Sequence, residues 1–496
     1  MSPALLFSFV VGYFAILLAV AWVTSRGANN ESFFIGNKNS NWMLVAFGMI
    51  GTSLSGVTFI SVPGAVGATA FTYFQIVLGQ LLGYGVIAFV LLPIFYRLNL
   101  TSIYHYLDIR LGPRSYKTGA SFFILSRTVG ATARLYLVVK ILQDAILDGL
   151  HVPFWLTAAV IIIMILLYTY EGGVKTIVWT DTLQTTCMLL GLVISVVYVL
   201  NSLDISVGES LQQMQARGLS GIFSTDINSK QFWLKQVLAG MFIAISMTGM
   251  DQEMMQKNIS VKTLADSQKN IIVLSIIMLC VVLLFLFLGG LLYLYAPTVG
   301  VTAIGDKIFP AIVLGHLPAM VQIIFVIALI SALFPSADGA ITALTSSFCI
   351  DILAMKRRES WREADRKRIR QRVHLSFAAL FLLLVMVFKW ADNPSMIGLI
   401  LKLAGFTYGP LLGLFAFGIL TRRAVRDSLV PWIAIAAPVV CYVLDTYQQV
   451  LLGEYQIGLE LLIVNGALTF VGLWLASKPS EAKPGNKADR KSIVEV

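Results

Sequence analysis

Charged residues and cysteines are scarce in this 496-residue sequence. Asp, Glu, Lys and Arg make up only 12% of the residues, whereas soluble globular domains carry roughly a quarter. The four cysteines lie far apart and form no CxxC pair, which argues against a disulfide framework or a cysteine metal site. The sequence patterns of phosphate-binding loops, zinc proteases and serine hydrolases are absent as well. These absences argue against a soluble protein and against an enzyme.

Apolar residues are abundant, at 57% of the chain with a mean hydropathy of +0.82. Runs of about 20 apolar residues predict membrane-spanning helices, and we number the thirteen predicted spans from 0 to 12. Their approximate limits are 4–23, 42–66, 72–95, 119–148, 152–170, 177–200, 233–252, 270–296, 320–353, 373–391, 395–420, 428–446 and 456–476. Span 0 lacks a basic start and a cleavage site, so we interpret it as a helix and not as a signal peptide. We therefore expect an all-α polytopic protein of the plasma (inner) membrane.

The basic residues fall mainly into alternate loops, which explains the net charge of +10 better than nucleic-acid binding does. Loops on one side hold Arg97, Arg110, Arg114, Lys117, Lys257, Lys262, Lys269, the run from Lys356 to Arg372, Arg422, Arg423, Arg426 and the tail from Lys478. The opposite loops hold little beyond Arg217, Lys230 and Lys307. Basic loops face the cytoplasm, so the amino terminus is predicted outside and the carboxyl terminus inside. An odd number of spans agrees with this arrangement.

Span 1 contains the polar stretch GTSLSGVTF at 51–59. Glycine weakens a helix, and serine and threonine offer its backbone competing hydrogen bonds. The stretch therefore predicts a local unwinding, and irregular backbone in a membrane is tolerated around a cavity or an ion. A packing seam of small residues is the alternative interpretation.

Span 8 contains ALFPSADGAITALTSS at 332–347. Pro335 has no N–H, so the carbonyl of Ser331 loses its helical donor. We expect a bent helix that presents carbonyls, the Ser336 hydroxyl and the Asp338 carboxylate, which are oxygen ligands that suit a hard cation. Alternatively, Asp338 pairs with a basic residue of span 3.

Three further charged residues within predicted spans are candidates for a functional role. Asp181, in WTDTLQTT at 179–186, is either a ligand of a cation or proton or a favourable charge in the first turn of span 5. Arg127 and Arg134 are seven residues apart on span 3 and share a face. Their anion is either a protein carboxylate, such as Asp338, Asp181 or Glu253, or the carboxylate of an acidic solute.

Spans 1–5 and 6–10 are predicted to form two inverted halves, as in many secondary transporters. The Gly- and hydroxyl-bearing stretch SMTGMDQ at 246–252 interrupts span 6 where GTSLSG interrupts span 1. The predicted units are therefore residues 1–30 (a peripheral helix), 31–200 and 201–425 (the two repeats), 426–476 (two more helices) and 477–496. The last unit is expected to be a disordered cytoplasmic tail.

Five ordered segments resemble the solute:sodium symporter family, which includes sodium/glucose, sodium/proline and sialic-acid cotransporters. They are ESFFIGNKNSNW (31–42), EGGVKTIVWTDTLQ (171–184), GMDQEMMQKNISVKTLADSQKN (249–270), LTSSFCIDIL (344–353) and GFTYGPLLGLFAFGIL (405–420). The resemblance covers roughly residues 4–475. It implies an inverted five-plus-five helix core in a sodium-coupled symporter that works by alternating access, with no oligomer required.

The resemblance also implies the ion sites. The main sodium site would lie between spans 1 and 8, at Gly51, Leu54, Ala332, Pro335 and Ser336. Pro335 stands where many members carry serine, so one hydroxyl ligand is missing. A second site would use Asp181 of the WTD motif, here with Asp338, for either sodium or a proton.

The implied solute pocket includes hydroxyl, aromatic, amide and guanidinium groups, at Ser53, Ser55, Thr58, Phe74, Gln75 and Arg134, with Lys402 as a further candidate. Span 7 lacks the lysine of the sugar-transporting members, which argues against a galactose-type sugar. The combination of hydroxyls with an arginine resembles the sialic-acid transporters. The expected solute is thus small, polar and possibly acidic, such as sialic acid or another carboxylate. A sugar:sodium symporter, a proton-coupled transporter and, least favoured, a membrane sensor are the alternatives.

Overall fold

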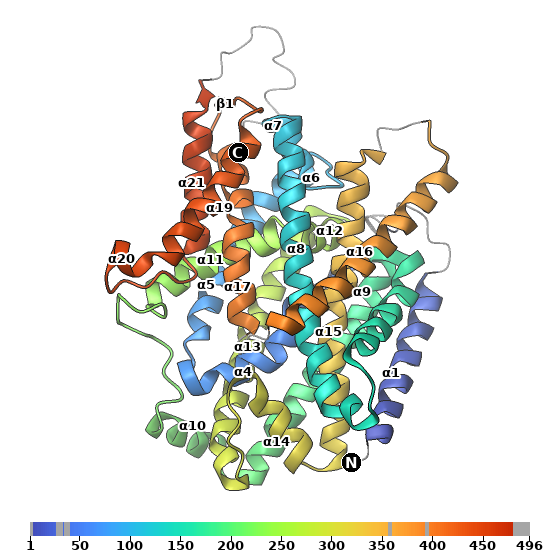
Figure 1. Cartoon of the computed structure of the whole chain (residues 1–496), viewed down its shortest axis with the longest axis vertical. Coiled ribbons are helices and arrows are strands. Elements are labelled where there is room, and N and C mark those ends of the chain that lie inside the picture. The colour runs from blue at the N-terminus through green and yellow to red at the C-terminus, as the bar shows by residue number, and fades with distance from the viewer. Residues whose placement is uncertain (1–2, 26–32, 34–39, 356–359, 392–395, 480–496) are drawn as a thin grey trace.

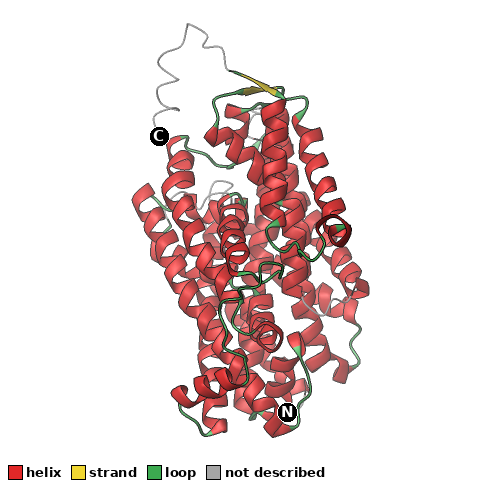
Figure 2. Cartoon of the chain, turned by 90° about the vertical axis from the view of Figure 1, so that its left-hand side faces the viewer, coloured by secondary structure: helices red, strands yellow, loops and turns green. Residues whose placement is uncertain are grey.

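The computed structural model describes residues 3–25, 33, 40–355, 360–391 and 396–479. Helices make up nearly the whole molecule, and most of them run along its long axis (Figures 1 and 2). The chain enters the bundle at the bottom of Figure 1 and leaves it at the top. The predicted tail beyond Lys478 and most of the 31–42 motif lie outside the described residues.

The helices that build the bundle follow one another along the chain. They are α1 (Pro3–Thr24), α3 (Trp42–Ser53), α4 (Gly56–Thr69), α5 (Tyr73–Val86), α6 (Leu92–Arg97), α7 (His105–Arg110), α8 (Pro113–Leu142), α9 (Phe154–Leu203), α10 (Val207–Ala216), α11 (Trp233–Ala244), α12 (Gln252–Ile259), α13 (Leu264–Tyr295), α14 (Ile308–His316), α15 (Ala319–Ser347), α16 (Glu363–Ala391), α17 (Met396–Thr407), α18 (Gly409–Leu420), α19 (Val430–Thr446), α20 (Gln448–Leu452) and α21 (Leu461–Leu475). The two-residue strands β1 (Ala424–Val425) and β2 (Ser477–Lys478) pair antiparallel at one end.

Each predicted span coincides with helical structure in the described residues. Seven helices are long and apolar enough to cross a membrane, three bent pairs pass the same test together, and three shorter helices are apolar. Spans 4 and 5 have no loop between them, because α9 runs from Phe154 to Leu203. It contains the shorter apolar helix Phe154–Thr169 and the membrane-length helix Thr176–Leu203. An all-α multi-pass membrane protein is confirmed, whereas the number of thirteen crossings stays a prediction.

Two of the three predicted helix interruptions are present. The helices α3 and α4 meet at a 55° bend, and the segment Trp233–Gly249 meets α12 at a 65° bend. The third predicted interruption is wrong, because α15 continues through Pro335 without a break. Instead, an unpredicted 45° bend separates α17 from α18.

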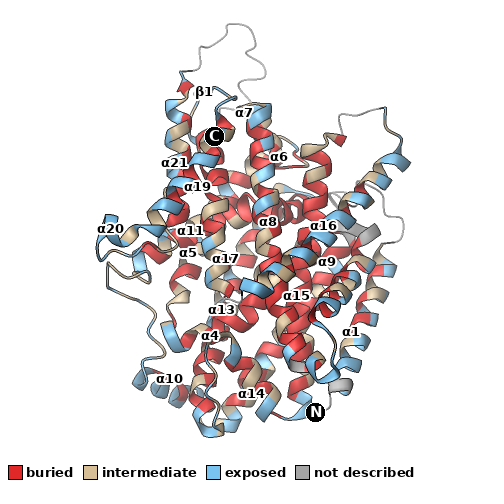
Figure 3. Cartoon of the chain, in the orientation of Figure 1, coloured by how far each residue is buried: buried red, intermediate tan, exposed pale blue. Residues whose placement is uncertain are grey.

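The helix α15 forms the centre of the bundle and is buried along most of its length (Figure 3). It packs against α9, α8, α16 and both halves of span 1, while α1 packs on the outside of α9. Large apolar side chains such as Phe7 and Trp22 of α1 are exposed, as expected of a lipid-facing surface. Many of the buried polar side chains belong to α15, α9 and the two bent spans.

Candidate ion and solute site

The bend in span 1 leaves backbone carbonyls without helical partners. The last turn of α3 ends at Leu54 (φ −92°, ψ 59°), whose N–H donates to the carbonyl of Ile50 at 2.8 Å. Within the described part of the chain, no backbone N–H bonds to the carbonyls of Gly51, Thr52, Ser53 and Leu54. Carbonyls at a helix end need another donor or a cation, so the bend presents oxygen atoms inside the bundle.

Glycines let this bend pack closely against its neighbouring helices, and the bend lies in contact with α15. A Cβ atom built on Gly51 would lie 3.5 Å from Cγ of Pro335 and would clash with Oγ1 of Thr185 on α9. On the other side of the bend, a Cβ atom on Gly56 would lie 3.7 Å from the backbone of Leu333. Span 1 therefore contacts α15 around residues 333–335, at its unwound segment.

The facing part of α15 is dry and rich in oxygen atoms. Ala332 and Ser336 have relative exposures of 0% and 1%. The Ser336 hydroxyl donates to the carbonyl of Leu333 at 2.8 Å, and Pro335 has no N–H to offer the carbonyl of Ser331. The structure thus places the five residues predicted for the main sodium site on the two sides of one helix contact.

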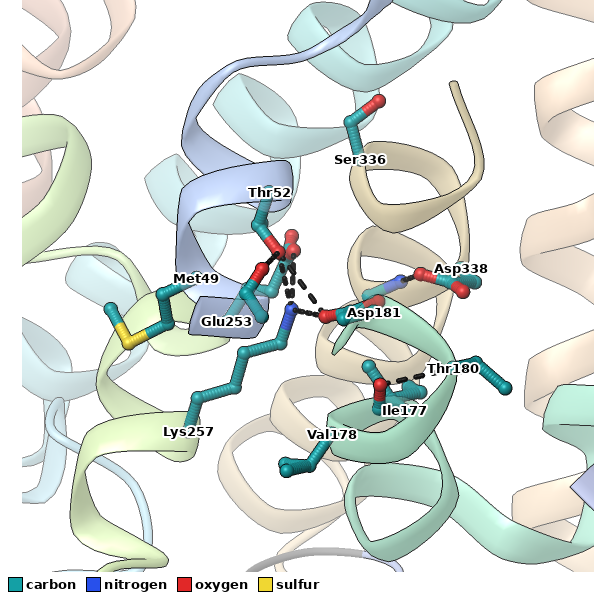
Figure 4. A network of polar contacts seen from close by, with 12 residues as sticks. Met49, Thr52, Ile177, Val178, Thr180, Asp181, Glu253, Lys257, Ser336 and Asp338 are labelled. Carbon is teal, nitrogen blue, oxygen red and sulfur yellow. Dashed lines mark hydrogen bonds and ion pairs between the residues drawn. The ribbon is translucent and has the colours of Figure 1, made fainter. Parts of the chain in front are cut away.

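A lysine occupies the neighbourhood of Asp181. The Nζ atom of Lys257 lies 2.7 Å from Oδ2 of Asp181, 2.7 Å from Oγ1 of Thr52 and 3.7 Å from Oε1 of Glu253 (Figure 4). Asp181 itself lies well inside α9, so its predicted position in a first helical turn is wrong. One glycine, Gly48 of α3, brings span 1 against Asp181, because a Cβ atom there would be 3.0 Å from the aspartate Cβ.

Asp338 takes no part in this ion pair. One of its oxygens accepts a hydrogen bond from the Tyr168 hydroxyl at 2.7 Å, and the other accepts from the backbone N–H of Gly339. In Figure 4, Asp338 lies beyond Asp181 as seen from Lys257. The suggested partnership of Asp338 with a basic residue of span 3 is not present in the described structure.

The two arginines of α8 differ in their partners. Arg127 is buried and pairs with Glu253 and, at 3.9 Å, with Asp251. The Tyr408 hydroxyl donates to the same Asp251 carboxylate at 2.7 Å. Among the described residues, Arg134 has no carboxylate oxygen within 4.0 Å, which is the distance limit for an ion pair. The anion of Arg127 is therefore a protein carboxylate, while Arg134 has its charge available.

Arg134 lies on the wall of a cavity of about 100 Å³ beside the span 1 bend. The predicted residues Ser53, Ser55 and Thr58 line the same cavity. Its full lining is Thr52, Ser53, Leu54, Ser55, Val57, Thr58, Tyr73, Gln80, Tyr84, Arg127, Arg134, Ile243, Ala244, Met247, Thr248, Met254, Met278, Val282, Ile397, Ile400 and Leu401. One cavity thus joins the bend of span 1, the bend of span 6, the two arginines of α8 and the helix α17.

Three predicted pocket residues lie elsewhere. Phe74 and Gln75 do not line the cavity, and the Gln75 amide donates to the carbonyl of Gln231 at 3.3 Å. Their neighbour Tyr73 occupies the wall instead. Lys402 pairs at 2.7 Å with Asp445 on the surface.

Sequence reasoning assigned Lys257 to a cytoplasmic loop, but its side chain is only 3% exposed. The four-residue spacing of Glu253 and Lys257 was the available signal, because such a pair shares one face of a helix. Tyr408 was missed as well, and no local pattern pointed to its contact with Asp251.

These features together define a class of membrane protein. Two bent spans at corresponding positions, open carbonyls and a polar cavity between them are the arrangement of a membrane secondary transporter. The family model described as the sodium:solute symporter family matches residues 33–428. The chain belongs to this family, it is a transporter and not an enzyme, and sodium is its co-transported ion.

Known relatives are distant but extend along most of the chain. The sodium/sialic acid symporter of Proteus mirabilis is 22% identical over 463 residues, covering 87% of each protein. The mouse sodium-coupled monocarboxylate transporter 1 is 27% identical and covers 83% of this chain and 67% of its own length. A solved structure of a Na⁺-coupled sialic acid symporter in a substrate-bound outward-open state has a TM-score of 0.81 at 18% identity, covering 96% of this chain and 99% of the other. The fold is therefore the inverted five-plus-five transporter core.

Proposed function

We propose that this transporter imports a small anionic solute together with sodium, and that Arg134 binds the solute's negative charge. The observation that carries the proposal is the unpaired guanidinium of Arg134 on the cavity wall beside the hydroxyls of Ser53, Ser55 and Thr58. A guanidinium within a membrane span is costly without an anion, and it binds a carboxylate through two parallel hydrogen bonds. The Ser53 hydroxyl is buried and has no hydrogen-bond partner, so it is free to bond a solute oxygen.

The names of the relatives support an acidic solute. One is a sodium/sialic acid symporter and another a monocarboxylate transporter, and both solutes carry a carboxylate. Arg134 on the cavity wall would bind the carboxylate of such a solute. Arg127 is already neutralised by Glu253.

Sodium is proposed to bind where the span 1 bend meets α15. The proposed ligands are the carbonyls of Gly51, Leu54, Ala332 and the backbone around Pro335, with the hydroxyl of Ser336. Open carbonyls on Gly51 and Leu54 and the close approach of Gly51 to Pro335 support this assignment. Leu54 and Ser55 also line the solute cavity, so the ion and the solute would meet the same unwound segment.

This shared segment explains how the two cargoes would be coupled. If sodium holds the bend of span 1 in the form that binds solute, solute must tighten sodium binding by the same factor. With the amino terminus outside and the carboxyl terminus in the cytoplasm, inward sodium movement releases about 2.3 kcal/mol per charge per 100 mV of membrane potential. The two repeats, proposed as residues 31–200 and 201–425, would rock around the bend to expose the cavity alternately.

The test is ligand-induced thermal stabilisation of the purified protein with sialic acid, pyruvate and galactose, each in sodium chloride and in choline chloride. We expect an acid to stabilise the protein in sodium only. Arg134→Gln should abolish this stabilisation, and Arg134→Lys, which keeps the charge, should retain part of it. Equal stabilisation of wild type and Arg134→Gln by an acid, or stabilisation by galactose alone, would contradict the proposal.

A further inference from the structure

We infer that the ammonium group of Lys257 is a tethered cation that permanently fills the second ion position beside Asp181, so that one sodium ion binds the protein and not two. This inference rests on the proposed sodium site at the span 1 bend. It replaces the prediction of sodium or a proton between Asp181 and Asp338.

The ammonium group of Lys257 lies among three side-chain oxygen atoms. Lysine has three N–H donors, and three oxygens face Nζ of Lys257: Asp181 and Thr52 at 2.7 Å each, and Glu253 at 3.7 Å. Lys257 and Asp181 have relative exposures of 3% and 1%. A charge buried this deeply is retained only with good partners; here the ammonium donates hydrogen bonds to Thr52 and Asp181 and forms a longer ion pair with Glu253.

These oxygens are the ones that a free cation would need. The Asp181 carboxylate on α9 and the Thr52 hydroxyl on α3 are hard oxygen ligands, and both contact the ammonium. A sodium ion on the same oxygens would lie next to a second positive charge in a dry environment, where repulsion between charges is strong. Sodium and the ammonium therefore exclude each other.

The pairing of the neighbouring charged side chains leaves one cation to neutralise Asp181. Glu253 also pairs with Arg127, and Asp338 is held separately by Tyr168 and its own helix backbone. Lys257 is therefore the cation that neutralises Asp181 within the described structure. Without it, the Asp181 carboxylate would be a buried anion with the Thr52 hydroxyl as its remaining partner.

The tether also connects the moving parts. Lys257 belongs to α12, directly after the bend in span 6, Thr52 belongs to the end of α3, directly before the bend in span 1, and Asp181 belongs to α9. A covalently attached ammonium gives these three helices a cation that cannot leave during transport. It therefore contributes no charge to the net transport of ions.

Equilibrium binding of ²²Na⁺ to the purified full-length protein tests this inference without any solute. Wild type should bind one sodium ion per chain at saturation. Lys257→Met should bind two, a two-fold increase, because sodium enters the vacated position. Adding Asp181→Asn to Lys257→Met should restore one, and Lys257→Arg should bind one. Lys262→Met, on an exposed residue of the following loop, is the matched control and should bind one.

The other outcomes distinguish a failure of the tethered cation from a failure of the proposed sodium site. Two sodium ions on wild type, or one on Lys257→Met, would overturn the tethered cation and leave the proposed sodium site standing. No bound sodium on wild type would overturn the proposed sodium site and the inference with it. If Lys257→Met does not fold, the count on wild type and on Lys257→Arg still decides, because two ions on either would refute the inference.

Discussion

Replacing Lys257 by Met in sodium-free buffer should destabilise the protein far more than replacing a surface lysine whose ion pair has the same N–O distance. The chain contains a matched comparison. Lys257–Asp181 and Lys402–Asp445 are both Lys–Asp pairs at 2.7 Å, but the lysine side chains are 3% and 55% exposed, respectively. The difference between the two substitutions therefore isolates the effect of burial on the charge pair.

The expected magnitude follows from that burial. Removing one partner of a buried ion pair leaves an uncompensated charge and costs about 3–5 kcal/mol, whereas an exposed pair contributes about 0.2–1 kcal/mol. For a chain of 496 residues, an unfolding entropy of about 2.1 cal/mol/K per residue gives about 1 kcal/mol/K. Lys257→Met should thus lower Tm by about 3–5 °C and Lys402→Met by no more than about 1 °C.

The assay is thermal unfolding of the purified proteins in sodium-free choline chloride buffer, repeated in sodium chloride. The double variant Lys257→Met/Asp181→Asn should melt above Lys257→Met alone, because the buried carboxylate that lost its partner has also been removed. Sodium chloride should raise the Tm of Lys257→Met by more than it raises the Tm of wild type. An equal loss of Tm for Lys257→Met and Lys402→Met would refute the claim that the buried pair is a stabilising charge contact.

Three further predictions address the sodium site and the orientation. Gly51→Ala should weaken sodium stimulation of uptake at least tenfold, because the new Cβ atom would clash with Oγ1 of Thr185 on α9 and shift the unwound segment. Gly85→Ala, whose Cβ atom would meet nothing within 4 Å, should leave uptake unchanged, and equal effects would contradict the assignment. Ser336→Ala should raise the sodium concentration for half-maximal uptake several-fold at an unchanged maximal rate, and an unaltered sodium dependence would remove Ser336 from the ligands. In a cysteine-free background on intact cells, a membrane-impermeant maleimide should label Thr225→Cys but not Arg422→Cys, and the reverse pattern would invert the topology.

The helices and two of the bends could be predicted because their causes are local. Apolar runs determine which segments enter a membrane, and clustered glycines and hydroxyls weaken a helix wherever they occur. The predicted break at Pro335 failed for a non-local reason. Membrane helices tolerate proline where neighbouring helices pack around them, and α15 is buried between α9, α8 and α16 around Pro335.

The candidate site was predictable in its residue types and only partly in its geometry. The hydroxyls at Ser53, Ser55 and Thr58 line the cavity because they accompany the bend that creates it. On α5, the sequence does not determine how the helix is rotated, and successive residues point about 100° apart. Tyr73 therefore lines the cavity where Phe74 and Gln75 were predicted.

The buried position of Lys257 could not be predicted from the distribution of charged residues along the sequence. The positive-inside pattern places a lysine near the cytoplasm from its position in the sequence alone. Its partner Asp181 is 76 residues away in the chain, so only the packing of α12 against α3 and α9 brings them together. A hydropathy profile cannot predict a contact between residues this far apart in the sequence, whereas the folded structure shows it.

Anomalous diffraction from crystals grown with thallium(I) in place of sodium would locate the bound cation directly. We predict one peak between the carbonyls of Gly51 and Leu54 on span 1 and the Ala332–Ser336 segment of α15, and none beside Asp181. A peak beside Asp181 with none at the bend of span 1 would contradict the proposed sodium site and the tethered lysine together.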